Sequence, residues 1–347
     1  MQYLSLHFIK NILRKFAAGF YTMFYLLQKN LRFQIFVMFA LAGLFCYQLL
    51  VLPVDVRFPD SFLPLSQSLG QWMMQNPLTL KLGIVLIFAL QSIFLFLYFK
   101  RNKFDEQTSL LPCAALAVFA IAGGSAAICS PVLIANFILT SLLLLSDDSD
   151  HKHQKGRVLL SGILIGIASF FDITLFLIAA AFLFILLTNR FNSINDIFVT
   201  LIGIAIPYIY CFAYFFFVDE FPRFLDSFTH IHLVFPLFTD THPSVVTLIS
   251  VGIGIILFIY ILVKLKIRFD YKLIVVRKRF VNTHILFVIL AGVILLTNIP
   301  FPVSVNYMAV PLSIYLAAYA PSRRLSITKE VVLTVFLTAT VLVWMGI

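Results

Sequence analysis

Charged residues are scarce in this chain. Of its 347 residues only 12% are Asp, Glu, Lys or Arg, whereas 61% are hydrophobic and the mean hydropathy is +1.02. An ordinary soluble domain has about 25% charged residues, so this composition excludes that class. In their place the chain has long apolar runs, and about 20 apolar residues are enough for one membrane-spanning helix. We therefore predict an all-α polytopic integral membrane protein that contacts the lipid bilayer over much of its surface.

Cysteine is also scarce, and familiar catalytic motifs are missing. The four cysteines all lie in or at the ends of apolar runs, and none forms a C-x-x-C pair, which favours small buried side chains over a redox or metal site. There is no Walker loop, no dinucleotide fingerprint, no HExxH motif and no G-x-S-x-G motif in a fitting context. We therefore expect no cofactor. The net charge of +10 is explained by cations in loops, so no nucleic-acid partner is expected.

The stretch 147–190 organises the rest of the chain. Between Val158 and Thr188 the only charged residue is Asp172. One helix of that length would be about 46 Å long, whereas the hydrocarbon core is about 30 Å thick. Two helices that meet at Phe170-Phe171-Asp172 would be about 21–24 Å each. Their turn would then lie below the membrane surface, where an ionisable side chain normally faces a partner or a water-filled cavity.

The distribution of Lys and Arg decides between these interpretations. The runs 110–146 and 281–320 are also too long for one span, so with the N-terminus inside we count about 11 transmembrane helices. The expected spans are about 33–52, 81–99, two in 110–146, two in 158–188, 197–217, 244–263, two in 281–320, and 331–346. This topology puts 22 of the 25 basic residues inside, whereas a single helix over 158–188 would move the basic loop expected at 264–280 outside.

The expected domain organisation follows from this topology. Residues 1–32 form a basic amphipathic segment, which we expect to lie on anionic inner-leaflet lipids. Residues 33–346 form a single transmembrane domain. Its two large outer loops, 53–80 and 218–243, each contain an apolar stripe at helical spacing, which in the second loop includes Phe221, Phe224 and Leu225. We expect both stripes to form helices along the membrane interface.

The outer face collects the side chains that can carry chemistry. Carboxylates there can act as general bases, and cations and imidazoles can bind an anionic group. The candidate catalytic residues are Asp60, Asp55 and Asp172, and the candidate phosphate-binding residues are Arg57, Arg223 and His230. The alternatives are solvated loop acids at 55 and 60 and a turn residue at 172 that reaches interface water, while Asp219 and Glu220 can simply begin a helix.

Two histidine-containing pairs give a divalent metal only weak support. They are His230-x-His232 and Asp240-x-His242, and a spacing of two does not put both side chains on one helical face. His284, near the inner end of a span, is expected to be a structural histidine with a satisfied hydrogen bond.

The run from Lys155 to Glu220 carries a resemblance. Its elements are the hairpin Gly162 to Ser169, the link Arg190-Phe191-Asn192, and Gly203 through Pro207-Tyr208 to Asp219. In these the chain resembles an uncharacterised bacterial domain-of-unknown-function family of polytopic inner-membrane proteins, over about 85–320. The resemblance implies a multi-pass protein of the bacterial inner (cytoplasmic) membrane.

The order of parts is more distantly similar to the GT-C glycosyltransferases, which use polyprenyl-phosphate sugars. That resemblance implies a GT-C-like helical core, a polyprenyl-phosphate lipid as partner, and a first-loop carboxylate, here Asp55 or Asp60, as the base. Many such enzymes have an adjacent Asp-Glu pair in that loop, and this chain has none. The expected function is transfer of a sugar to an acceptor on the outer face. The alternatives are a non-catalytic assembly or scaffold protein, and a transporter or flippase.

Overall fold

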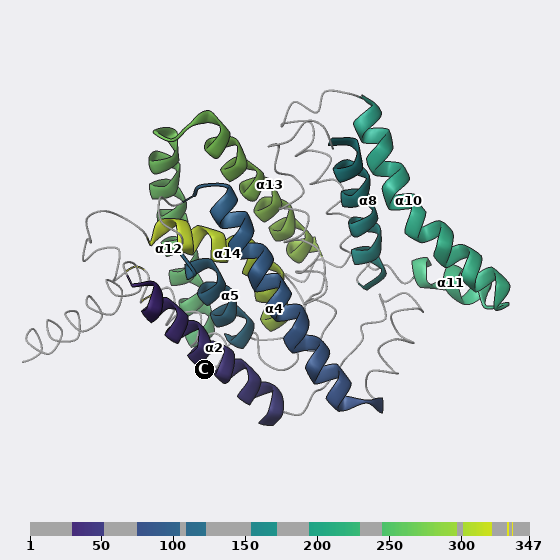
Figure 1. Cartoon of the computed structure of the whole chain (residues 1–347), viewed down its shortest axis with the longest axis horizontal. Coiled ribbons are helices and arrows are strands. Elements are labelled where there is room, and N and C mark those ends of the chain that lie inside the picture. The colour runs from purple at the N-terminus through teal and green to yellow at the C-terminus, as the bar shows by residue number, and fades with distance from the viewer. Residues whose placement is uncertain are drawn as a thin grey trace, which may run out of the picture.

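The computed structural model describes residues 30–51, 75–104, 109–122, 154–171, 194–229, 245–296 and 301–320, together with Val332 and Val335. The elements formed by these residues are all α-helices (Figure 1). They are α2 (Leu31–Val51), α4 (Pro77–Arg101), α5 (Leu111–Ala122), α8 (Gln154–Phe171), α10 (Ile194–Phe217), α11 (Phe221–Thr229), α12 (Val245–Asp270), α13 (Ile274–Leu296) and α14 (Phe301–Tyr319). Residues 1–29 of the expected segment 1–32 and residues 53–74 of the first outer loop expected at 53–80 lie outside the described residues. That loop was expected to reach residue 80, but α4 already begins at Pro77.

Three of these helices are long and apolar enough to cross a membrane. The qualifying stretches are Arg32–Val51 in α2, Leu78–Arg101 in α4 and Asn195–Phe217 in α10. Their boundaries lie within a few residues of the spans expected at 33–52, 81–99 and 197–217. The described elements are thus all helical, as predicted, and three of them could cross a membrane. The count of 11 spans stays a prediction.

Contacts between helix ends show how the helices are directed. The backbone N–H of Leu110, just before α5, donates to Gln34 near the start of α2 over 2.9 Å. The side chain of Arg279, near the start of α13, donates to the carbonyl of Arg101 at the end of α4 over 3.4 Å. Since α5 follows α4 after a short connection, α2, α5 and α13 begin at the end of the molecule where α4 finishes.

The same end receives two more helices. The α12–α13 connection is only three residues long, 271–273, so α12 ends where α13 begins. Arg268 in the last turn of α12 donates to the carbonyl of Ala318 in the last turn of α14. The opposite end is marked by Lys81, whose ammonium donates to the carbonyl of Leu50 over 3.4 Å. These directions agree with the predicted topology.

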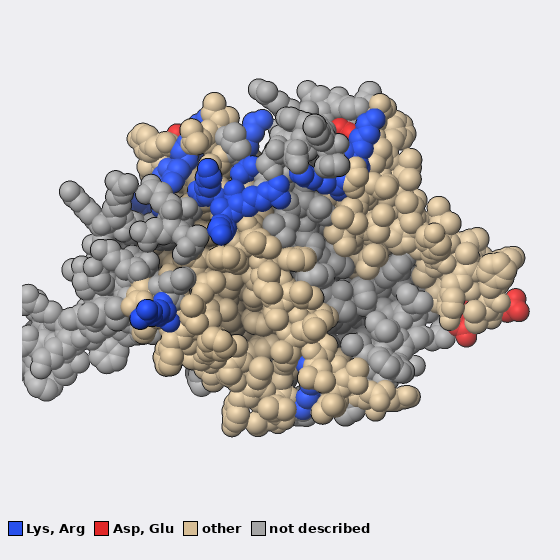
Figure 2. All heavy atoms as spheres, in the orientation of Figure 1, with Lys and Arg blue, Asp and Glu red and all other residues tan. Residues whose placement is uncertain are grey.

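Basic side chains gather at the first of these ends, which we call the basic end. Figure 2 shows a blue band along this edge of the molecule, over the ends of α4 and α12 and the beginnings of α8 and α13. Its members are Lys100, Arg101, Lys103, Lys155, Arg157, Lys264, Lys266, Arg268, Lys272, Arg277, Lys278 and Arg279. The acids Asp219, Glu220 and Asp226 lie beyond α10, at the far end of that helix.

One expectation about this end was wrong. Residues 264–280 do not form a loop, because α12 continues to Asp270 and α13 begins at Ile274. The reason is an apolar face that continues past the membrane-length stretch: Leu265 and Phe269 are buried on α12, and Val276 and Phe280 on α13. Burial of that face stabilises the extra turns, so most of these cations are carried on helices.

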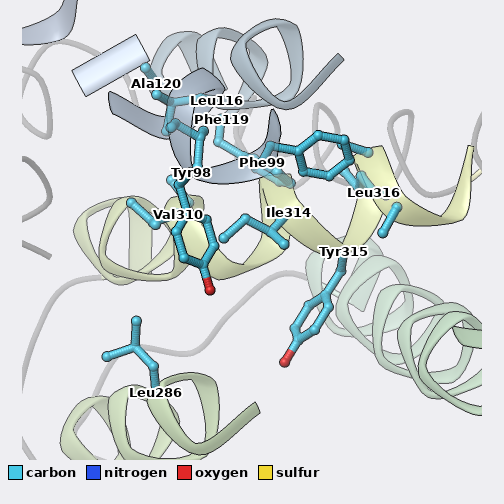
Figure 3. Packing of buried hydrophobic residues seen from close by; sticks show 14 of the residues in the cluster. Tyr98, Phe99, Leu116, Phe119, Ala120, Leu286, Val310, Ile314, Tyr315 and Leu316 are labelled. Carbon is cyan, nitrogen blue, oxygen red and sulfur yellow. The ribbon is translucent and has the colours of Figure 1, made fainter. Parts of the chain in front are cut away.

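The core of the bundle is built around α14. From Ala309 to Ala320 nearly every side chain is buried, including Ser313, whose hydroxyl donates to the carbonyl of Val310 over 2.7 Å. Figure 3 shows Val310, Ile314 and Leu316 of α14 among residues of α4 and α5. A helix that is apolar on all sides belongs in the centre of a bundle.

The direction of the helices can be tested by chemical labelling. Lys100→Cys and Asp226→Cys would be made in a chain whose four native cysteines are replaced. Because Lys100 lies at the basic end and Asp226 at the opposite one, an impermeant maleimide should label only the Asp226→Cys variant in sealed right-side-out vesicles. After the membrane is permeabilised it should label both, since both positions are exposed. Labelling of the Lys100→Cys variant in intact vesicles would contradict the predicted orientation.

Candidate functional site

Most of the predicted site residues lie outside the described residues. These are Asp55, Arg57, Asp60, Asp172 and His230. Arg223 is placed on α11, but its side chain is also outside what the structure describes. The structure does describe the helices that lead to the end opposite the basic end, namely α8, α10 and α11.

Helices α8 and α10 pack with their backbones in close contact. A Cβ atom added to Gly162 would collide with the carbonyl oxygen of Thr200, and one added to Gly203 would lie 2.5 Å from the carbonyl oxygen of Leu159. One turn further along, Gly166 faces Ile204 and Pro207. Small residues permit this close approach of helices within membranes.

The two helices run parallel. Higher numbers in α8 face higher numbers in α10, and the series ends where the hydroxyls of Ser169 and Tyr208 lie 2.7 Å apart. The end of α8 and the beginning of α10 are therefore at opposite ends of the pair. This is the arrangement that the two-helix interpretation of 147–190 predicts, since a chain that leaves α8 at one end must enter α10 at the other.

The described residues of α8 stop at a different level from the end of α10. Beyond the Ser169–Tyr208 pair, α8 continues for two residues to Phe171, whereas α10 continues for nine residues to Phe217. At 1.5 Å per residue, the described end of α8 falls about 10 Å short of the end of α10. The next residue in the chain after Phe171 is Asp172.

Beyond α10 the chain turns sharply into α11. Asp219 adopts a left-handed conformation with φ of 61°, and the carbonyl of Glu220 accepts a hydrogen bond from the N–H of Phe224 over 3.3 Å. Glu220 thus begins the helix, as one of the alternatives for this acid predicted. A carboxylate at this position is also favourable toward the helix dipole.

Aromatic contacts fasten α11 to the end of α10. The ring of Phe224 is buried and stacks on Phe215 with 5.4 Å between centroids, and Phe221 meets Phe212 at 4.8 Å. Two residues of the predicted apolar stripe therefore pack against α10, whereas the stripe was expected to lie along the membrane interface. Leu225, the third, is exposed and makes the outer surface of α11 apolar as well.

The end opposite the basic end carries negative charge near the turn from α10 into α11, which we call the α10–α11 elbow. Asp219, Glu220 and Asp226 are all exposed (Figure 2). Within the described ranges there is no group of three His, Cys, Asp or Glu side chains that can hold a metal ion. The histidines that gave a metal its weak support, His230, His232 and His242, lie outside those ranges.

The structure also brings together polar residues that sequence reasoning did not connect. Near the basic end the hydroxyl of Tyr98 lies 3.3 Å from that of Thr283, and the hydroxyl of Tyr315 lies 3.0 Å from Nδ1 of His284. In Figure 3 both tyrosine hydroxyls point away from Leu116, Phe119 and Ala120. The expected structural role of His284 is thereby confirmed. Only its position near a span end signalled that role, and the pairing with Tyr315 had no signal in the sequence.

Comparison with known proteins finds no similar protein. No protein-family model, no curated protein and no solved structure matches the chain. Function must therefore be inferred from the residues of the chain and their arrangement.

Proposed function

We propose that this protein is a multi-pass inner-membrane glycosyltransferase that moves a sugar from a polyprenyl-phosphate donor to an acceptor on the outer face. The observation that carries the proposal is the parallel packing of α8 and α10, which brings Phe171 toward the end of the pair that is opposite the basic end. Phe171, the last described residue of α8, lies about 10 Å inward of the end of α10, and Asp172 is the next residue in the sequence. An acid at membrane depth marks a functional site by default.

Two further features support the outer end as the working face. The positive-inside rule assigns the basic end to the cytoplasm, so the end with Lys81 and the α10–α11 elbow faces outward. The contacts of Phe221 with Phe212 and of Phe224 with Phe215 hold α11, the helix that carries Arg223, against the end of α10. A lipid-linked donor would reach a site at this level from within the bilayer.

The chemistry assigned to the site is a displacement at the sugar. Asp60 or Asp55 takes the proton of an acceptor hydroxyl, the hydroxyl oxygen forms a bond to the anomeric carbon, and the bond from that carbon to the phosphate oxygen breaks. The bonding electrons leave with the polyprenyl phosphate. Arg57, Arg223 and His230 stabilise its charge, and Asp172 lines the floor of the site.

A transporter receives less support from the described residues. The buried face of α4 carries polar groups in its inner half, at Gln91 and Tyr98. Further outward the buried positions of α4 are Leu80, Ile84 and Phe88, which are apolar. Along α4, therefore, no polar path continues from Gln91 to the outer end.

Sugar transfer by purified protein tests the proposal. Wild type in lipid nanodiscs would be offered a panel of radiolabelled polyprenyl-phosphate sugars and periplasmic acceptors, beside Asp60→Asn, Asp55→Asn and Asp172→Asn. We expect transfer by wild type and a loss of about 10²-fold or more when the base is removed. The matched control is Asp226→Asn on α11, an exposed acid with no assigned role, which should transfer sugar like wild type.

Two results would count against the proposal. One is the absence of transfer from every donor by protein that elutes and melts as a folded species. The other is transfer that is equally fast in all three variants. The first result would favour a scaffold protein whose outer loops dock partners. The second would show a transferase whose base is none of Asp55, Asp60 and Asp172.

A further inference from the structure

The basic end is built on a rigid aromatic cluster. Phe269 of α12 and Phe280 of α13 stack with 4.1 Å between ring centroids. Phe104, which follows α4, meets Phe269 edge-on at 5.8 Å and Phe280 at 6.3 Å. All three rings are almost fully buried, so the chain segments that carry them are held in fixed relative positions.

Each of these three rings directly follows a basic residue. The pairs are Lys103-Phe104, Arg268-Phe269 and Arg279-Phe280. Burial of each phenylalanine therefore sets the backbone position of a neighbouring cation. We call the cations on these segments the basic corner: Lys100, Arg101, Lys103, Arg268, Lys272, Arg277, Lys278 and Arg279.

Backbone geometry and hydrogen bonds hold the segments of the corner together. Lys103 has φ of 51°, the left-handed turn that folds Phe104 back under α4. Arg279 donates to the carbonyl of Arg101, and Arg268 to that of Ala318. The eight cations outnumber the acids that lie in or next to the same segments, which are Asp105, Glu106 and Asp270, so the formal charge of these segments is positive.

Exposed apolar side chains adjoin these cations. Tyr271, Leu273 and Ile274 form the α12–α13 connection and the start of α13, and they are 89%, 76% and 65% exposed. The apolar stretch of α4 also ends at Arg101, which places the corner at the membrane boundary. A dissolved anion would gain nothing from contact with the apolar side chains. An amphiphile with an anionic headgroup, by contrast, contacts both the cations and the apolar side chains.

We propose that the basic corner is a binding site for an anionic phospholipid. The phosphate of the headgroup lies between the cations of the α4 end and those of α13. Tyr271, Leu273 and Ile274 enter the boundary between headgroups and acyl chains. This site is separate from residues 1–32, and it does not depend on the proposed glycosyltransferase activity.

Retention of lipid by the purified full-length protein tests this site. Native mass spectrometry would count bound phosphatidylglycerol, with phosphatidylcholine as the neutral-headgroup comparison. The test variant is Arg101→Gln/Lys103→Gln/Lys278→Gln, which leaves the capping residues Arg268 and Arg279 in place. We expect wild type to retain phosphatidylglycerol selectively, and the test variant to lose about 5-fold in affinity per cation removed.

The matched control removes the same charge elsewhere at the basic end. It is Lys155→Gln/Lys264→Gln/Lys266→Gln, and it should retain phosphatidylglycerol like wild type. Thermal unfolding without added lipid would verify that both variants fold.

Three results would overturn the proposal. The first is equal loss of lipid in both triple variants, which would show a diffuse surface potential. The second is displacement of the lipid by millimolar inorganic phosphate, which would show a site for a free anion. The third is tighter binding of a single-stranded RNA oligonucleotide than of phosphatidylglycerol, which would show a nucleic-acid surface.

Discussion

Replacing Gly203 by alanine should separate α8 from α10. The new Cβ would lie 2.5 Å from the carbonyl oxygen of Leu159, and neither backbone can move away without parting the helices. Overpacking of this kind costs about 1–3 kcal/mol, and contact with backbone puts this site at the upper end of that range. Thermal unfolding in detergent should show a clear fall in Tm, and the Ser169–Tyr208 hydrogen bond should be lost with the packing.

The matched control for Gly203→Ala is Gly252→Ala in α12. A Cβ at Gly252 would meet nothing within 4 Å. Since alanine is favoured over glycine within a helix by about 1 kcal/mol, this change should leave Tm unchanged or raise it. A Gly203→Ala protein as stable as the Gly252→Ala protein would contradict the close parallel packing of α8 and α10.

Replacing Phe104 by alanine should weaken the whole basic end. Phe104 is fully buried and contacts rings on α4, α12 and α13, with 5.7 Å to both Tyr98 and Phe99. Truncation of a buried phenylalanine removes its packing and leaves a cavity, at a cost of about 3–5 kcal/mol. The expected result is a lower Tm and faster proteolysis of the α12–α13 connection.

Phe39→Ala is the control for the loss of a phenylalanine. This residue of α2 is exposed on the outside of the bundle, so its removal should change Tm little. Equal destabilisation by the two changes would show that Phe104 contributes no more than an average lipid-facing ring.

The sequence was a good guide to helix direction and a poor guide to contacts between distant helices. The count of Lys and Arg residues in the loops predicted that α4, α12 and α14 end on the side of the membrane where α2, α5 and α13 begin. That count needs to know only which loops lie on the same side. The two-helix interpretation of 147–190 likewise agreed with the parallel pairing of α8 and α10. The contact of Gly162 with Gly203, however, depends on which helices become neighbours, and no local pattern encodes that choice.

The density of cations led to a wrong prediction at the basic end. Seven cations in 264–280 indicated a loop, since charge is unfavourable in a membrane helix. The buried positions Leu265, Phe269, Val276 and Phe280 have helical spacing, and they show that these turns pack on the bundle. At the opposite end the predicted helix at 221 was found, and Leu225 proved exposed, whereas Phe221 and Phe224 contact rings of α10.

The bonds between α4 and α13 also constrain how the protein is made. Tyr98 and Thr283 are 185 positions apart in the chain, and Arg279 and Arg101 are 178 apart. At about 5–20 residues per second, the ribosome takes about 10–40 s to supply the second partner of each bond after the first. For that interval the hydroxyl of Tyr98, which is buried in the folded protein, has no partner from α13. A truncated product that stops before α13 would lack this partner permanently, which makes it a natural target for membrane quality-control proteases.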